Sequence, residues 1–196
     1  MADEERNVRE KLLEAGTEEF LKYGFRGASL RRICASAGVT TGALYFFFEN
    51  KEDLFCRIVE KPLAIGRRLF EEKTQEEFEH PETAVDNEDQ LIQLLMRYRR
   101  ECILLLDKAE GTRYAHYREE YEKKLEATFL QFFDAYTAGR ADPALVHLIM
   151  SMRLQGYLEL IYRNPPMDEA RKLVEGMAYY ADAGFAALVK KINEEG

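Results

Sequence analysis

The residues of this chain that could do chemistry lie close together in the sequence. They are hydroxyl-bearing, basic and aromatic side chains around a glycine: Ser29, Arg31, Arg32, Thr40, Thr41, Gly42, Tyr45, Phe46 and Lys51. Hydroxyls and cations of this kind bind phosphate groups, and a threonine can also contact a base edge or a thymine methyl group. Residues 20–51 contain five basic residues and one acidic residue, whereas the whole chain has a net charge of −8. A positive window in an acidic chain indicates a surface that faces a polyanion.

Local signals predict that these residues lie on two short helices joined by a tight turn. Helices are expected over 30–36 and 41–48, with Ser29 and Thr40 as N-caps and Gly38 as the residue that ends the first helix. The apolar residues expected in their shared core are Ile33, Val39 and Leu44. This pattern predicts a helix-turn-helix, in which the second helix enters the major groove of DNA.

The same segment resembles the DNA-binding domain of the TetR family of transcriptional regulators. The resemblance covers roughly residues 8–60. It is carried by the segments 20–25, 29–34, 37–42, 44–48 and 50–54. The remainder of the chain matches the family only in length and helical character.

Composition and apolar periodicity predict an all-α fold of about nine helices, in agreement with the resemblance. Residues 1–50 are expected to form an N-terminal helix-turn-helix domain of three helices. Residues 51–196 are expected to form a helical effector-binding and dimerisation domain. The implied function is that of a repressor that binds a palindromic double-stranded DNA operator as a homodimer and leaves it when a small-molecule effector binds.

Two aromatic positions depart from the family's pattern. Phe46 and Phe47 stand where the family usually has polar-tipped aromatic residues or histidine. Each phenylalanine removes one hydrogen bond to phosphate, so we expect either weaker phosphate binding or contact between Phe46 and a thymine methyl group. The alternative function is a helical ligand-binding or adaptor protein that has lost DNA binding.

Several other classes of protein are not expected. No Gly-rich phosphate loop or nucleophile elbow is present, so we expect neither enzyme activity nor a cofactor. Glu77 and His80 have the spacing of a di-iron helix, but a second such pair is missing and no metal is expected. The chain has no run of about 18 apolar residues that would span a membrane.

The cysteines and the N-terminus indicate where the protein works. Cys34, Cys56 and Cys102 are odd in number and far apart, which does not favour a disulfide framework. The acidic N-terminus lacks the apolar stretch of a secretory signal. We therefore expect a protein of the reducing cytoplasm.

Apolar periodicity predicts the helices outside the motif. They are expected over 5–23, 51–70, 88–107, 112–138, 143–163 and 168–192. Pro62 is expected to kink or end its helix, and the acid-rich stretch 71–88 is expected to fray into a loop. Thr112 and Asp168 are expected to cap the helices that follow them.

The resemblance also implies two further sites in the C-terminal part. An effector pocket is expected among aromatic, apolar and a few polar side chains of three helices: Leu95, Tyr98, Arg99, Cys102, Tyr117, Tyr121, Leu125, Phe129, Met150, Arg153, Leu154 and Tyr157. A four-helix dimer interface is expected from the last two helices. On the last helix it would use Leu173, Met177, Ala181, Gly184, Phe185 and Leu188.

Overall fold

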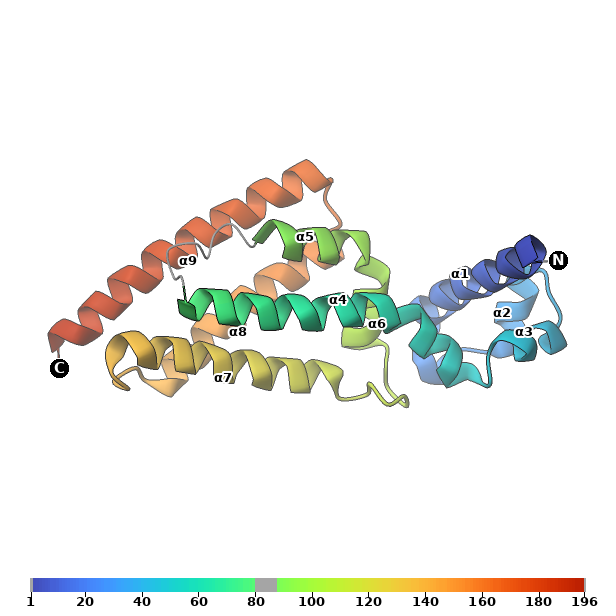
Figure 1. The fold of residues 1–196 in the computed structure, drawn as a ribbon, viewed down its shortest axis with the longest axis horizontal. Coiled ribbons are helices and arrows are strands. Elements are labelled where there is room, and N and C mark those ends of the chain that lie inside the picture. Colours follow the sequence, from blue (N-terminus) through green and yellow to red (C-terminus); the bar gives the residue numbers. More distant parts are fainter. Residues whose placement is uncertain (1, 80–87, 196) are drawn as a thin grey trace. The chain divides into compact units, whose positions relative to one another are not determined.

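The computed structural model describes residues 2–79 and 88–195, which form nine α-helices and no strand (Figure 1). The helices are α1 (Ala2–Gly27), α2 (Leu30–Ala37), α3 (Thr41–Phe47), α4 (Lys51–Glu79), α5 (Glu88–Arg97), α6 (Arg99–Asp107), α7 (Tyr117–Thr137), α8 (Pro143–Arg163) and α9 (Met167–Glu195). The expected all-α fold is confirmed.

The chain divides into two compact units. The first contains Met1–Ile65 and Tyr98–Glu119, and the second contains Gly66–Arg97 and Glu120–Gly196. The chain therefore passes from one unit to the other within α4, between α5 and α6, and near the start of α7.

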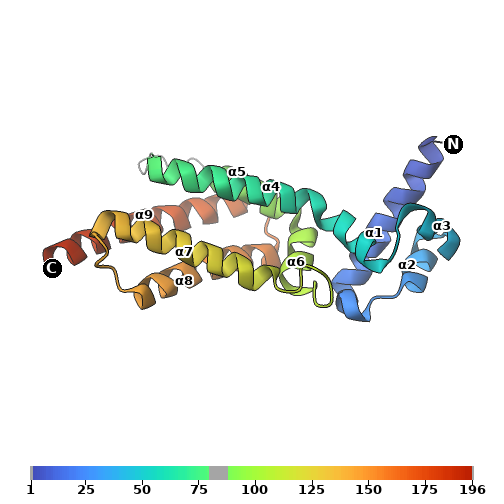
Figure 2. The same cartoon turned by 60° about the horizontal axis from the view of Figure 1, so that its bottom comes forward.

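The first unit packs α1, α2, α3, the start of α4 and α6 around one core. Its fully buried residues are Leu12, Phe20, Ile33, Leu44, Phe48, Leu54, Phe55, Val59 and Leu104. α1 bends at Gly24, where φ is 67°, a value that glycine adopts without steric cost. The expected helix end at Gly24 is thus a bend followed by one more turn. Figure 2 shows α2 and α3 side by side against α1.

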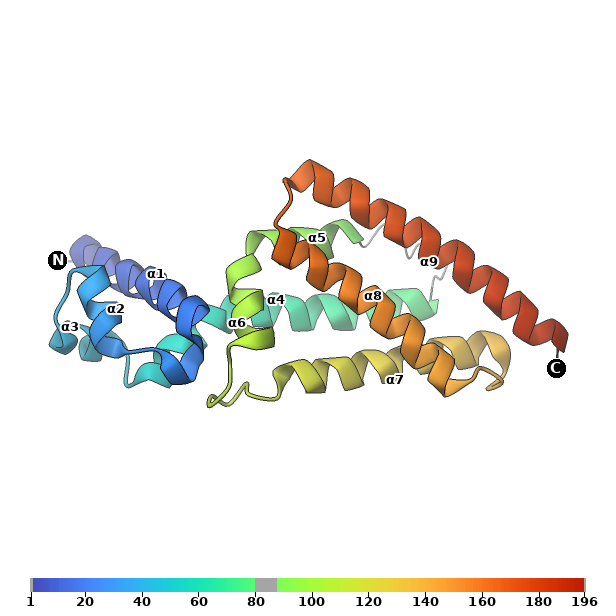
Figure 3. The same ribbon diagram turned by 180° about the vertical axis from the view of Figure 1, so that it is seen from behind.

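The second unit consists of the end of α4 together with α5, α7, α8 and α9. α8 and α9 form a helical hairpin (Figure 3). α8 ends at Arg163 and is capped by Asn164, which has φ 51° and ψ 53°. Ile92, Leu160 and Val174 form one apolar cluster, which joins α5, α8 and α9. Phe133 and Val146 belong to another cluster, at the turn from α7 to α8.

Tertiary structure changes several expected helix boundaries. Pro62 does not end its helix, because α4 continues to Glu79 through a buried proline. The loop predicted over 71–88 is therefore wrong up to residue 79, where glutamates favour a helix; residues 80–87, including His80, lie outside the described part of the chain.

Two further helix boundaries also differ from the expected ones. The helix expected over 88–107 is interrupted at Tyr98, which has φ −112° and ψ 31°, where the chain leaves one unit for the other. Thr112 does not cap a helix, because its hydroxyl donates to the Ala109 carbonyl and accepts from the Tyr114 N–H in a turn. The last helix begins at Met167, so Asp168 lies within its first turn.

Candidate nucleic-acid interface

A tight turn joins α2 to α3. Gly38 ends α2 with φ 68° and ψ 31°, the left-handed conformation, and its N–H points to the carbonyls of Cys34 and Ala35. Thr40 caps α3, because its Oγ1 accepts a hydrogen bond of 3.2 Å from the N–H of Ala43. The predicted turn and the Thr40 cap are confirmed, and they fix the direction of α3 relative to α2.

The two sides of α3 differ sharply in burial. Leu44 and the following Phe48 are fully buried in the core of the first unit. Thr41 and Gly42 lie on the exposed side, where Tyr45 and Phe46 retain 58% and 71% of their surface. A helix anchored on one side and bare on the other presents small and aromatic side chains outward, which suits insertion into a groove.

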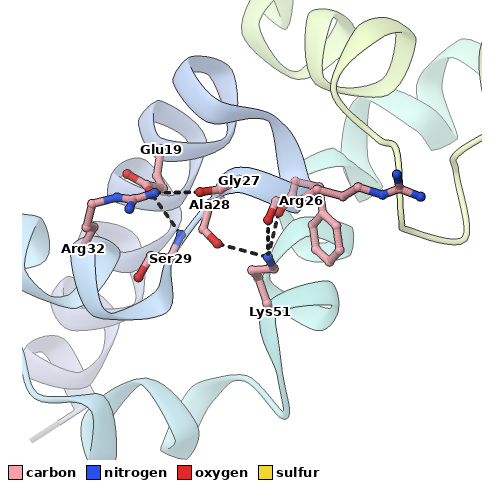
Figure 4. A network of polar contacts seen from close by, with 8 residues as sticks. Glu19, Arg26, Gly27, Ala28, Ser29, Arg32 and Lys51 are labelled. Carbon is pink, nitrogen blue, oxygen red and sulfur yellow. Dashed lines mark hydrogen bonds and ion pairs between the residues drawn. The ribbon is translucent and has the colours of Figure 1, made fainter.

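The carboxylate of Glu19 holds the start of α2 (Figure 4). Its Oε1 accepts hydrogen bonds from the Ser29 N–H at 2.9 Å and from Arg32 Nε at 2.7 Å. The Ser29 side chain makes no capping bond, so the expected serine cap is replaced by a glutamate ten residues earlier. Sequence reasoning missed Glu19. Its signal was an acidic residue among the apolar positions of the first helix.

The two neighbouring arginines of α2 have different roles. Arg32 bonds to Glu19 and to the Gly27 carbonyl at 2.7 Å, and its guanidinium carbon lies 4.5 Å from the centre of the Tyr23 ring. The bond with Glu19 raises the pKa of Arg32 above its usual value. Arg31 points to the exposed surface. Arg31 therefore stays available for a phosphate, whereas Arg32 holds α1 against α2.

The ammonium of Lys51 lies against the end of α1 (Figure 4). Its Nζ donates to the carbonyls of Phe25 at 2.7 Å, Ala28 at 3.0 Å and Arg26 at 3.5 Å. Burial lowers the pKa of Lys51. The ammonium expected to contact phosphate keeps its positive charge, but its three donors are directed to these carbonyls.

The structure thus gathers the nine predicted DNA-contacting residues in the first unit, from the start of α2 to the start of α4. Those that face outward are Arg31, Thr40, Thr41, Gly42, Tyr45 and Phe46. Ser29, Arg32 and Lys51 instead form hydrogen bonds with residues of α1.

The sequence of this chain is similar to those of known proteins. Residues 12–58 match the family model of bacterial regulatory proteins of the tetR family. The chain is 27% identical over 176 residues to the HTH-type transcriptional regulator YhgD of Bacillus subtilis, covering 82% of this chain and 88% of YhgD. It is 41% identical over 81 residues to the HTH-type transcriptional repressor BepR of Brucella suis, covering 38% of this chain and 34% of BepR.

This chain is a TetR-family transcriptional regulator. A transcriptional regulator from Aquifex aeolicus has the same fold, with a TM-score of 0.59 and 22% identity over 88% of this chain and 99% of that one. Membership of this family accounts for the helix-turn-helix.

The residues predicted for an effector pocket of this TetR-family regulator fall into both units. Tyr98, Arg99, Cys102 and Tyr117 belong to the first unit. The second unit holds Leu95, Tyr121, Leu125, Phe129, Met150, Arg153, Leu154 and Tyr157. Phe129 and Arg153 lie together, with the guanidinium carbon 5.8 Å from the centre of the ring.

Phe129 and Arg153 line an open groove of about 960 Å3 between α7, α8 and α9. Most of its lining was missed, including Phe132, Tyr136 and Tyr180. The signal was present in α7, because 129, 132, 133 and 136 follow the spacing of one helical face and are all aromatic.

The residues predicted for a dimer interface also divide into two groups. Met177, Phe185 and Leu188 pack against apolar clusters of their own chain. Leu173 is exposed, and an added Cβ at Gly184 would meet no atom within 4 Å. Three exposed apolar residues of α8 were missed, namely Leu145, Leu148 and Met152.

Metal sites and membrane-spanning helices are both missing from the part of the chain that the structure describes. In that part of the TetR-family chain, no group of three or more His, Cys, Asp or Glu side chains could hold a metal ion. None of the described helices is long and apolar enough to cross a membrane.

Proposed function

We propose that this regulator is a repressor that binds a palindromic double-stranded DNA operator as a homodimer and that a small-molecule effector releases it. The observation that carries the proposal is the exposed side of α3, where Thr41, Gly42, Tyr45 and Phe46 stand above a fully buried core. BepR, which is 41% identical to this chain over 81 residues, is named a repressor. We propose that the protein acts in the cytoplasm.

We assign the proposed functions to two consecutive parts of the chain. Residues 1–50 provide the DNA contacts, and residues 51–196 provide the effector site and the dimer interface. α4 belongs to both compact units, so it is a covalent route by which a change in the second unit reaches the first. A ligand shifts this equilibrium only by its different affinity for the two states.

Dimerisation is supported by the apolar residues that α8 and α9 expose. Leu148 retains 60% of its surface on α8, and Leu173 and Tyr179 retain 39% and 78% on α9, all three outside the lining of the groove. Several exposed apolar side chains on neighbouring helices are typical of a protein interface. A palindromic operator also requires two recognition helices about 34–36 Å apart, which one chain does not supply.

Effector binding is supported by the groove between α7, α8 and α9. Apolar side chains, many of them aromatic, form most of its lining, and Arg153 and Asp182 are the charged residues there. An apolar groove with few polar groups suits an apolar small molecule that carries one or two polar groups.

Selection of DNA from a random pool tests the proposal. The wild-type protein should enrich a palindrome whose half-sites lie about one helical turn apart. Thr41→Glu should abolish that binding, because it places a negative charge on the exposed side of α3. Gln131→Glu, on the exposed surface of α7, is the control and should bind as the wild type does. Equal enrichment of all sequences would contradict the operator proposal.

A further inference from the structure

Phe46 is the most exposed aromatic residue of the helix-turn-helix. Its side chain lies on α3 and retains 71% of its surface, compared with 58% for the preceding Tyr45. Thr41, Gly42, Tyr45 and Phe46 share the exposed side of this short helix, since residues four apart lie on one face.

The ring of Phe46 is held in place although it is exposed. It meets the ring of Phe47 edge to face, with centres 4.9 Å apart and planes at 88°. Phe47 is itself half-buried and packs against the core of the first unit. The exposed ring therefore rests on a ring that the core supports, which limits the freedom it would lose on binding.

The chemistry of this ring restricts what it can recognise. A phenylalanine side chain neither donates nor accepts an ordinary hydrogen bond, so it contributes nothing to the donor and acceptor pattern of a base pair. The apolar group that the major groove presents is the C5 methyl group of thymine. Unmodified cytosine, adenine and guanine present no such group there.

We infer that Phe46 is a specificity-determining residue that contacts the C5 methyl group of one thymine in each half-site. The inference rests on the proposed use of α3 as the helix that enters the groove. It goes beyond that proposal, because it assigns one base type to one side chain. Tyr45, with its hydroxyl, serves the polar contacts beside it.

Replacement of thymine by uracil tests the inference, because this change removes the methyl group and leaves base pairing intact. The duplex is the one that the wild-type protein selects, and each thymine is replaced in turn. At one position per half-site, uracil should weaken wild-type binding about fourfold for each half-site, the effect of one buried methyl-sized group. Phe46→Ala should bind more weakly and should bind the thymine and uracil duplexes equally.

Tyr45→Phe is the matched control. It changes the neighbouring exposed ring and should weaken binding to both duplexes while leaving the uracil effect at about fourfold. Phe46 packs on the surface, so its replacement should leave the melting temperature unchanged.

Two results would overturn the inference while the operator proposal stands. One is sequence-specific binding in which no uracil replacement weakens the wild-type complex. The other is a uracil effect that is equally large in Phe46→Ala, since the methyl group would then be read by another residue. Failure of the wild type to select any sequence would overturn both the inference and the operator proposal.

Discussion

The Nζ atom of Lys51 lies 2.7 Å from the carbonyl oxygen of Phe25 and 4.5 Å from the centre of the Phe25 ring. The first residue of α4 therefore satisfies carbonyl groups at the end of α1, which the helix itself leaves without partners. Through this contact, Lys51 ties α1 to α4 beside the helix-turn-helix.

Lys51→Met should lower the free energy of unfolding by about 1–2 kcal/mol, because carbonyls that now accept from a charged donor lose it. Urea denaturation measures the effect. Lys22→Met is the matched control: Lys22 is an exposed lysine whose ammonium lies over the Tyr23 ring, and its replacement should change stability by less than about 0.5 kcal/mol. Equal stability of the Lys51 variant and the wild type would contradict the assigned role.

Glu19→Ala should destabilise the first unit by about 2 kcal/mol, because it removes the acceptor of the Ser29 N–H and the partner of Arg32. Glu10→Ala removes an exposed ion pair with Arg6 on the same helix and should have almost no effect. Thermal melting of both variants at pH 7 compares them. If the two variants melt alike, Glu19 does not hold α2.

Arg31→Ala and Arg32→Ala should separate phosphate contact from structural support. Arg31→Ala should weaken binding to every duplex, lower the slope of log K against log salt by about one unit and leave the melting temperature unchanged. Arg32→Ala should lower the melting temperature, because it loses its bonds to Glu19 and Gly27. Gel-shift titrations across salt concentrations, with melting curves, check both. If Arg31→Ala lowered the melting temperature and Arg32→Ala weakened DNA binding alone, the roles assigned to the two arginines would be wrong.

The thiols of Cys56 and Cys102 should differ in reactivity with pH. Burial raises the pKa of Cys102 to about 12, so at pH 8 only about 0.01% of it is thiolate, the form that reacts. Cys56 is half-buried and also has a raised pKa, mainly through burial. Iodoacetamide at pH 8 should therefore label Cys56 before Cys102, and labelling of Cys102 should rise as pH increases. Mass spectrometry of peptides measures the order, and faster labelling of Cys102 in the folded protein would contradict it.

Gly184→Glu should prevent dimer formation and, with it, operator binding. Nothing within 4 Å would meet a side chain at Gly184, so the folded chain tolerates the change. Glu175→Lys is the control, since nine positions along a helix turn the side chain to the opposite side, and Glu175 is exposed and lies outside the groove. Sedimentation velocity at micromolar concentration should show monomers only for Gly184→Glu. A wild type that is itself monomeric would contradict the dimer proposal.

Local signals in the sequence predicted the parts of this protein whose cause is local. Gly38, Thr40 and the Asp142-Pro143 pair act within a few residues of themselves, and the turn, the α3 cap and the start of α8 are where they were expected. The helix-turn-helix was predictable for the same reason, because its turn, its caps and its apolar spacing lie within one short segment.

Contacts between distant segments decided the remainder. Glu19 and Ser29 are ten residues apart, and Lys51 and Phe25 are 26 apart, so no local pattern shows that either pair bonds. Met177 and Phe185 have the spacing of an interface, but packing placed them against their own chain. Periodicity identifies the apolar side of a helix and leaves open which surface covers it, because burial depends on every element that packs there. The sequence by itself thus determined the helices and the helix-turn-helix. The tertiary structure decided which basic side chains form hydrogen bonds with α1, as Arg32 and Lys51 do, and which lie exposed, as Arg31 does.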